Sequence, residues 1–381
     1  MAGHDLIVVG ASAGGVEALS ALVTGLPADL SAAVCVVVHL RPDLHSHLSE
    51  VLARSTSLPV VPARHDAVLH PGTIYVAVPD LHFLVDRDGD RGVIRLVRGP
   101  RENRTRPSVD PLFRSAALAF GPRVIGVVLS GALDDGTAGL WMVKDRGGIA
   151  VVQDPDDAAV ASMPASALME VAVDHVASAR ALGPLLGRLS REPALAESTA
   201  APHKAAQELE REVGITAMDE EVHAASERYG HASRFACPDC GGVLWDVTGE
   251  GPLHYKCEVG HAHTAATLAE AQTESVEWAL WAALRALEDK VALSRRRGAL
   301  AASRGLDAFV EKFAVEEQAA EQHAAALRAL LRLDGRMGIR PRVNDDAVPL
   351  PVERDDVGVE PRGDMAVAHP DAAADSSASG S

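Results

Sequence analysis

The chain has 381 residues, of which 47% are hydrophobic and 23% charged, a composition typical of a globular protein with room for two domains. Its formal net charge of -17 argues against a general binder of nucleic acids or anionic membranes. No apolar run approaches the ~20 residues that a membrane span requires, and the first ten residues lack a secretory signal, so we expect a cytoplasmic protein.

Residues 5 to about 190 alternate valine-rich apolar runs with helical patterns. The runs predicted to be strands are 6–9, 32–38, 73–78, 93–97, 124–130 and 149–153. Continuously apolar strands are usually covered on both faces, which favours a mainly parallel sheet. The helical patterns between them lie at about 15–26, 46–56, 110–119 and 136–146. The sequence therefore predicts a doubly wound α/β domain over residues 1–192.

The first strand runs into a glycine-rich turn, VVGASAGGVEAL at residues 8–19. Such a turn can let the backbone approach a nucleotide phosphate. Three features disfavour that function here. The second strand ends in His39 instead of an acidic residue that would bind a ribose, no Tyr-x-x-x-Lys pair occurs, and no Gly-Lys-Ser/Thr follows the glycines.

The same turn also fits Gly-x-Ser-x-Gly, with Ser12 at its centre, between a strand and a helix. That context presents a serine as a nucleophile, and by analogy the Ala13 N–H is one donor to the oxyanion. His39 ends the neighbouring strand and can serve as the base. Asp134 and Asp135 follow the strand 124–130, and either can orient the histidine.

Each of these residues also has a simpler explanation. Ser12 can cap the helix that follows it, and His39 can be a hydrogen-bonded residue at a strand end. Either aspartate can form a turn or cap a helix. Because the carboxyl ends of parallel strands meet at one edge of the sheet, the convergence of all three residue types favours a catalytic triad.

Residues 5 to about 190 resemble the catalytic domain of the CheB chemotaxis protein-glutamate methylesterases. The resemblance rests on GASAGG, VVVHLRP, PGTIYVAVPDLH, RPSVDPLF, VVLSGALDDGTAGL and SMP at 162–164, in the family's order. It implies that Ser12 is the nucleophile, His39 the base and Asp135 the orienting acid. It also implies a cofactor-free serine hydrolase that removes methyl groups from glutamate methyl esters of chemoreceptors, and that can deamidate receptor glutamines.

The chain departs from the family's common pattern at Ala13, Ala132 and Asp134, where Thr, Met and Asn are frequent. The match begins within ten residues of Met1, so we expect no phospho-receiver domain in cis. The implied partners are methylated chemoreceptors or similar signalling proteins, and the opposing receptor methyltransferase. The alternative is a non-catalytic adaptor that binds receptor helices, which the complete set of three residues disfavours.

A Cys/His cluster lies in the predicted unit 233–266, after a linker and helix at 193–232. Its Cys-x2-Cys and Cys-x3-His spacings suit a tetrahedral structural zinc site. The predicted ligands are Cys237, Cys240, Cys257 and His261. His263 or His254 can replace the fourth ligand, and reduced thiols packed near Trp245 are the alternative to a metal site. Cys35 lies within a strand and is expected in the core.

Two long helical patterns at 267–336 predict an antiparallel hairpin, followed by a disordered acidic tail at 337–381. Trp278 and Trp281 lie on the hairpin, either packed or as a surface for a partner or a second copy. We hypothesise that this C-terminal region takes the regulatory place of the receiver domain.

Overall fold

The computed structural model describes residues 3–39, 47–196, 204–220, 222 and 230–334, and the predicted acidic tail lies outside them. Within these ranges the largest sheet has seven strands in the order β3-β4-β2-β1-β7-β8-β9, and every neighbouring pair is parallel. The strands are β1 (Leu6–Ala11), β2 (Ala33–Val38), β3 (Val60–Pro62), β4 (Ile74–Val76), β7 (Val124–Val128), β8 (Ile149–Gln153) and β9 (His175–Ala177). The predicted fold class, a doubly wound and mainly parallel α/β domain, is confirmed.

The central strand β1 shows why the sheet is covered on both faces. Its side chains alternate between two hydrophobic clusters, with Leu6 and Val8 in one and Ile7 and Val9 in the other. All four side chains are buried, which explains the unbroken apolar run in the sequence.

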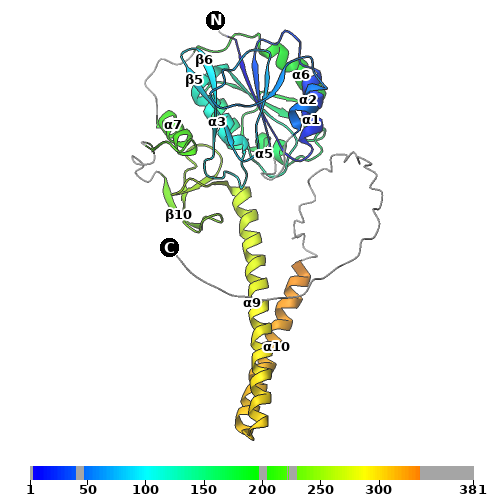
Figure 1. Cartoon of the computed structure of the whole chain (residues 1–381). Helices are drawn as coiled ribbons and strands as arrows, with labels where there is room; N and C mark the ends of the chain where they lie inside the picture. Colours follow the sequence, from blue (N-terminus) through cyan, green and yellow to red (C-terminus); the bar gives the residue numbers. More distant parts are fainter. Residues whose placement is uncertain (1–2, 40–46, 197–203, 221, 223–229, 335–381) are drawn as a thin grey trace, which may run out of the picture. The chain divides into compact units, whose positions relative to one another are not determined.

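Helices cover both faces of the sheet (Figure 1). The cluster with Ile7 also contains residues of α1 (Gly15–Thr24), α2 (Leu48–Ala53) and α6 (Ala179–Leu189). The cluster with Leu6 contains residues of α3 (Val109–Phe120), α4 (Thr137–Asp145), α5 (Ser162–Glu170) and α7 (Lys204–Thr216). The short 3-10 helix η1 (Gly121–Arg123) follows α3. From β1 the chain adds β2, β3 and β4 on one side of the sheet and later adds β7, β8 and β9 on the other, so the strand order switches sides at β1. Ligands of such folds bind at this crossing point, outside the carboxyl ends of the strands.

One predicted strand lies outside the parallel sheet. Residues 93–97 belong to β6 (Arg91–Val97), which pairs antiparallel with β5 (His82–Asp88). The predicted strand is thus present, but its partner is β5 and not a strand of the parallel sheet, because an apolar run predicts burial but not which strand it pairs with. The strands β3, β5 and β9 were not predicted.

The C-terminal region forms a second sheet and a helical hairpin. The sheet order is β10-β11-β12-β13, with β10 (His231–Ala236), β11 (Val243–Asp246), β12 (His254–Cys257) and β13 (Ala262–Thr264). Helices α9 (Ala265–Ser303) and α10 (Asp307–Asp334) pack together, and the ion pairs Arg328–Glu288 and Arg295–Glu321 show that they are antiparallel. None of the described helices is long and apolar enough to cross a membrane.

Candidate active site and metal centre

Ser12 lies in a tight turn between β1 and α1. It follows Ala11, the last residue of β1, and its backbone N–H donates to the Ser130 carbonyl at 2.9 Å. Its own carbonyl accepts from the Gly15 N–H at 2.8 Å, which closes the turn. Gly14 has φ 71, a left-handed conformation that glycine adopts without strain. The turn therefore leaves Ser12 half-buried at the carboxyl edge of the sheet.

The loop after β7 passes directly against Ser12. A Cβ placed on Gly131 would lie 2.9 Å from the Ser12 Cβ and 1.9 Å from the Met163 Sδ. Only a glycine fits in this space without displacing both neighbours. Met163 belongs to the SMP stretch and is fully buried, so this stretch packs the floor beneath Ser12.

His39 follows β2, next to the strand that leads into Ser12. Ala11 and Val38 are register partners in the two strands, and the His39 N–H donates to the Ala11 carbonyl at 3.3 Å. The His39 Nε2 lies 2.6 Å from the Asp135 Oδ2. Nδ1 is consequently the ring nitrogen that remains to exchange a proton with another group.

Asp135 is 1% exposed and accepts several hydrogen bonds besides that of His39. Its Oδ1 accepts from the Ser108 hydroxyl and the Asn103 Nδ2, both at 2.8 Å, and its Oδ2 accepts from the Val109 N–H at 2.7 Å. Burial by itself raises the pKa of Asp135, but His39 and these N–H groups outweigh burial and hold it at about 2. Asp135 is thus an ionised carboxylate of fixed orientation facing the imidazole.

The structure places the two neighbouring aspartates in different surroundings. Asp134 has no contact with His39 among the described residues, and its Oδ1 accepts the Thr264 hydroxyl at 2.7 Å. Burial raises the pKa of Asp134 to about 6, although that hydrogen bond opposes the shift. The sequence motifs by themselves did not distinguish Asp134 from Asp135 as the acid that orients the histidine. In the structure, Asp135 is the one that contacts His39.

Asp110 is a buried carboxyl group that was not among the predicted site residues. Its Oδ1 accepts from the N–H groups of Gly136 and Gly139 at 3.1 and 2.6 Å, at the start of α4. Its Oδ2 accepts from the same Asn103 Nδ2 that bonds Asp135, at 2.7 Å. Burial and the nearby charge of Asp135 raise the pKa of Asp110 well above its usual value. Asp110 therefore fastens the loop that carries Asp135. Its one signal in the sequence was its place in RPSVDPLF.

Two groups in the turn were predicted to take part in the reaction, namely the Ser12 hydroxyl and the Ala13 N–H. Within the described residues, the Ser12 hydroxyl makes no hydrogen bond to His39, a contact that is often long before substrate binds. The Ala13 N–H, predicted as an oxyanion donor, donates to no acceptor in the described part of the chain.

The four predicted metal ligands lie together. The ligand atoms of one group all lie within 4.8 Å of one another: Cys237, Cys240, Cys257 and His261. The Cys240 and Cys257 sulfurs are 3.6 Å apart, close to the ~3.7 Å that two thiolates have around tetrahedral zinc. Gly241, with φ 76, donates its N–H to the Cys237 carbonyl at 2.8 Å and forms the turn that brings the first two cysteines together.

The alternative fourth ligands occupy different places. His263 is fully buried, and its Nε2 lies 3.1 Å from the Asp239 Oδ2 and 3.9 Å from the Cys237 Sγ. With Cys237 and Asp239 it forms a second, overlapping group of candidate ligands. His254 belongs to neither group among the described residues. It is buried beside Glu212 and Lys256, and burial lowers its pKa to about 4. Cys35 is fully buried in β2, as expected.

Comparison with known proteins gives the following similarities. The CheB methylesterase family model matches residues 7–186. A protein-glutamate methylesterase/protein-glutamine glutaminase of Nocardioides sp. is 40% identical over 193 residues, or 50% of this chain and 52% of the relative. A relative from Leptospira interrogans, named a putative protein-glutamate methylesterase/protein-glutamine glutaminase, is 34% identical over 188 residues, or 49% of this chain and 96% of the relative. The chain thus spans about half the length of the first relative and nearly all of the second.

Among solved structures, the catalytic domain of the Thermotoga maritima CheB methylesterase is similar to part of this chain. The sequences are 30% identical, and the match covers 50% of this chain and 100% of that domain, with a TM-score of 0.48. The family match ends at residue 186, before the Cys/His sheet and the hairpin.

Proposed function

This chain belongs to the CheB methylesterase family, and from that premise we propose that it is a serine hydrolase of glutamate methyl esters on proteins. The observation that carries the proposal is the 2.6 Å contact between His39 and the buried Asp135, at the strand end beside Ser12. A carboxylate at one ring nitrogen holds the imidazole in the tautomer that accepts a proton at the other. A non-catalytic adaptor has no need of this arrangement.

The reaction proceeds in two steps. The Ser12 Oγ attacks the ester carbonyl while His39 takes the hydroxyl proton, and the Ala13 N–H stabilises the tetrahedral oxyanion. His39 then gives the proton to the departing methoxide, so methanol leaves and the glutamyl group stays on Ser12. Water, deprotonated by His39, attacks this acyl-enzyme and frees the glutamate carboxylate and the Ser12 hydroxyl. Deamidation of a glutamine follows the same steps with ammonia as the leaving group.

The substrates in this proposal are methylated chemoreceptors or similar signalling proteins, and a receptor methyltransferase is the enzyme with the opposing activity. The relatives' names support glutamate methyl esters and glutamines of proteins as the substrate groups, and the resemblance to chemotaxis methylesterases supports receptors as the proteins that carry them. The proposal also keeps the division into a catalytic domain at 1–192 and a separate C-terminal region. It places the reaction in the cytoplasm, because the three clustered cysteines must stay reduced to bind a metal.

Methanol release from a methyl-esterified chemoreceptor fragment tests the proposed activity. Ser12→Ala is expected to lower the rate by several orders of magnitude, because it removes the nucleophile. Ser20→Ala is the matched control, since Ser20 lies on α1 and its hydroxyl donates to the Val16 carbonyl of the same helix. Equal release from wild type and Ser12→Ala, or none from wild type, would overturn the proposal and favour the adaptor.

We further propose that Cys237, Cys240, Cys257 and His261 hold a structural zinc ion. Their spacing and mutual distances support this assignment. Elemental analysis of the purified chain is expected to give one zinc per molecule, and Cys240→Ser should lose it. Cys35→Ala, which alters the one cysteine outside the cluster, should retain the zinc. If His261→Ala retains the zinc and His263→Ala loses it, the fourth ligand is His263.

A further inference from the structure

The Cys/His sheet joins the candidate catalytic domain through its last strand, β13. The Asn103 N–H donates to the Ala262 carbonyl at 2.8 Å, and the Ala262 N–H donates to the Arg101 carbonyl at 3.3 Å. Glu102 and Ala262 form a parallel bridge between these two bonds. The segment 101–103 thus continues the Cys/His sheet, although it lies only a few residues before the loop that bonds Asp135.

Asn103 connects the two regions through its side chain as well. On one side its Nδ2 donates to both Asp110 and Asp135, at 2.7 and 2.8 Å. On the other side its Oδ1 accepts from the Thr264 N–H at 3.2 Å. The Thr267 hydroxyl lies 3.4 Å from the same oxygen, and its one proton also faces the Thr264 Oγ1 at 2.9 Å and the Thr264 carbonyl at 3.2 Å. Both N–H donors of the amide and one acceptor position of its oxygen are therefore used. The reversed amide would point its oxygen at the ionised Asp135 and its NH2 group at the Thr264 N–H, so the surrounding groups allow one orientation only.

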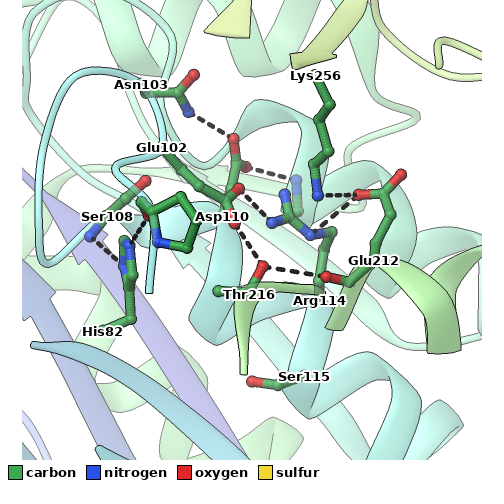
Figure 2. Close-up of polar contacts among 12 residues, drawn as sticks. His82, Glu102, Asn103, Ser108, Asp110, Arg114, Ser115, Glu212, Thr216 and Lys256 are labelled. Atoms are coloured by element: carbon green, nitrogen blue, oxygen red, sulfur yellow. Dashed lines mark hydrogen bonds and ion pairs between the residues drawn. The ribbon is translucent and has the colours of Figure 1, made fainter. Parts of the chain in front are cut away.

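Buried ion pairs hold the same junction together (Figure 2). Arg114 of α3 pairs with Glu102 and, at 3.3 Å, with Glu212 of α7, and the Glu212 Oε2 lies 3.3 Å from the Lys256 Nζ of β12. The Thr216 hydroxyl donates to the Glu102 Oε1 at 2.6 Å. These side chains are at most 4% exposed. The residue next to Asn103 is thus anchored to both α7 and the Cys/His sheet.

From these contacts we infer that Asn103 is a positioning residue that makes the orientation of Asp135 depend on the docked segment 262–267. This inference rests on the proposed esterase function and deepens it, because it names a regulatory connection to the same site. When the segment is docked, the Thr264 N–H donates to the Asn103 oxygen beside the Thr267 hydroxyl, and the Asn103 Nδ2 donates to the Asp135 Oδ1. When the segment is displaced, the amide loses the donors that fix its orientation, and Asp135 loses one fixed partner.

The inference predicts a change at His39 that does not require substrate. The proton between the His39 Nε2 and the Asp135 Oδ2 is strongly deshielded in a short hydrogen bond to a carboxylate, and NMR of the full chain with ¹⁵N-labelled histidine observes it. Thr267→Val keeps the side-chain shape and removes the hydroxyl that lies beside the Asn103 oxygen and bonds Thr264. Asn103→Gly removes the amide without backbone strain, because Asn103 has φ 50. Both variants are expected to shift or broaden this resonance.

The same variants are expected to lower kcat for methanol release by about 10- to 100-fold. KM should stay within about 2-fold, because Asn103 and Thr267 are buried away from substrate. Thr267→Ser, which restores a hydroxyl, should recover the wild-type resonance and rate. Glu274→Gln is the matched control, since Glu274 pairs with Arg104 at the same junction but does not contact Asn103.

The outcomes separate this inference from the proposed function. An unchanged His39 resonance and rate in Thr267→Val and Asn103→Gly, with both variants folded, would overturn the positioning role. A KM increase without a kcat decrease would also overturn it. If wild type releases no methanol but the resonance moves in the variants and recovers in Thr267→Ser, the proposed function fails and the link between Asn103 and Asp135 stands.

Discussion

At the scale of single residues, the site depends on the carboxylate of Asp135. It is almost fully buried, and His39, Ser108, Asn103 and the Val109 N–H all donate to it. An acceptor this well satisfied cannot rotate, so it fixes both the ring plane and the tautomer of His39. The same hydrogen bonds keep it ionised, with a pKa of about 2.

Asp135→Asn tests this dependence at almost unchanged shape. An amide N–H would face the histidine where an acceptor is needed, which favours the wrong tautomer. We expect kcat to fall by about 10⁴-fold with little change in KM. Asp134→Asn keeps an acceptor for Thr264 and should stay within about 3-fold of wild type in the same methanol assay. The reverse order of effects would assign the orienting acid to Asp134.

At the scale of secondary-structure elements, α3, α7 and β12 meet at the buried ion pairs of Figure 2. The contacts of Glu212 with Arg114 and Lys256 are ion pairs at 3.3 Å that are poorly aligned as hydrogen bonds. Their effect is consequently electrostatic, and it depends on all the charges being present. A missing partner would leave a cation without its counter-ion in the interior.

Glu212→Gln removes the shared anion from this group. Because Lys256 would then be buried without its ion-pair partner, we expect the free energy of unfolding to drop by about 3 kcal/mol. Urea unfolding of the full chain measures the change. Glu288→Gln in the hairpin is the comparison, because its half-exposed pair with Arg328 contributes less than about 1 kcal/mol. Similar losses in both variants would show that burial does not distinguish the two pairs.

The hairpin itself follows the predicted pattern only in part. Leu284, Phe313, Ala320 and Ala324 are buried between α9 and α10, but Val276 and Phe309, apolar residues at the same helical spacing, are exposed. Trp278 and Trp281 are also exposed, so their packing explanation does not hold within the described residues. Helical spacing identifies a common face, but contact ends where the partner helix ends.

At the scale of the whole molecule, stability is expected to depend on pH through His254. Burial lowers its folded pKa to about 4, whereas an unfolded histidine has a pKa near 6.5. The unfolded chain therefore takes up the proton first as pH falls. The stabilisation is fully present above about pH 6.5 and is lost as pH falls towards 4, by about 3 kcal/mol.

Urea unfolding at a series of pH values between 7 and 4 measures this loss. His254→Gln removes the titrating group and should flatten the profile in that window. Glu102 and Glu212 contribute at lower pH, because burial is outweighed by neighbouring cations and their pKa values are lowered. Their stabilisation disappears only as pH falls below the usual glutamate range. If the free energy of unfolding changes with pH by the same amount in wild type and in His254→Gln, the assignment to His254 is contradicted.

The local sequence determined the features that depend on neighbouring residues. The unbroken apolar runs predicted a sheet covered on both faces, since each strand has side chains on both sides. Ser12, His39 and Asp135 each follow a predicted strand, so parallel pairing alone brings them to one edge. The Cys-x2-Cys and Cys-x3-His spacings likewise placed the four candidate ligands together within a short segment.

Only the tertiary structure decided which distant groups meet. The pairing of β6 with β5 rather than with the parallel sheet depends on backbone partners, and an apolar run carries no information about them. Asn103 and Thr264 are separated by 161 residues, and Arg114 and Lys256 come together only through α7. Buried polar groups must find partners wherever the fold brings them, so the connection from the Cys/His sheet to Asp135 emerged from packing and not from any motif.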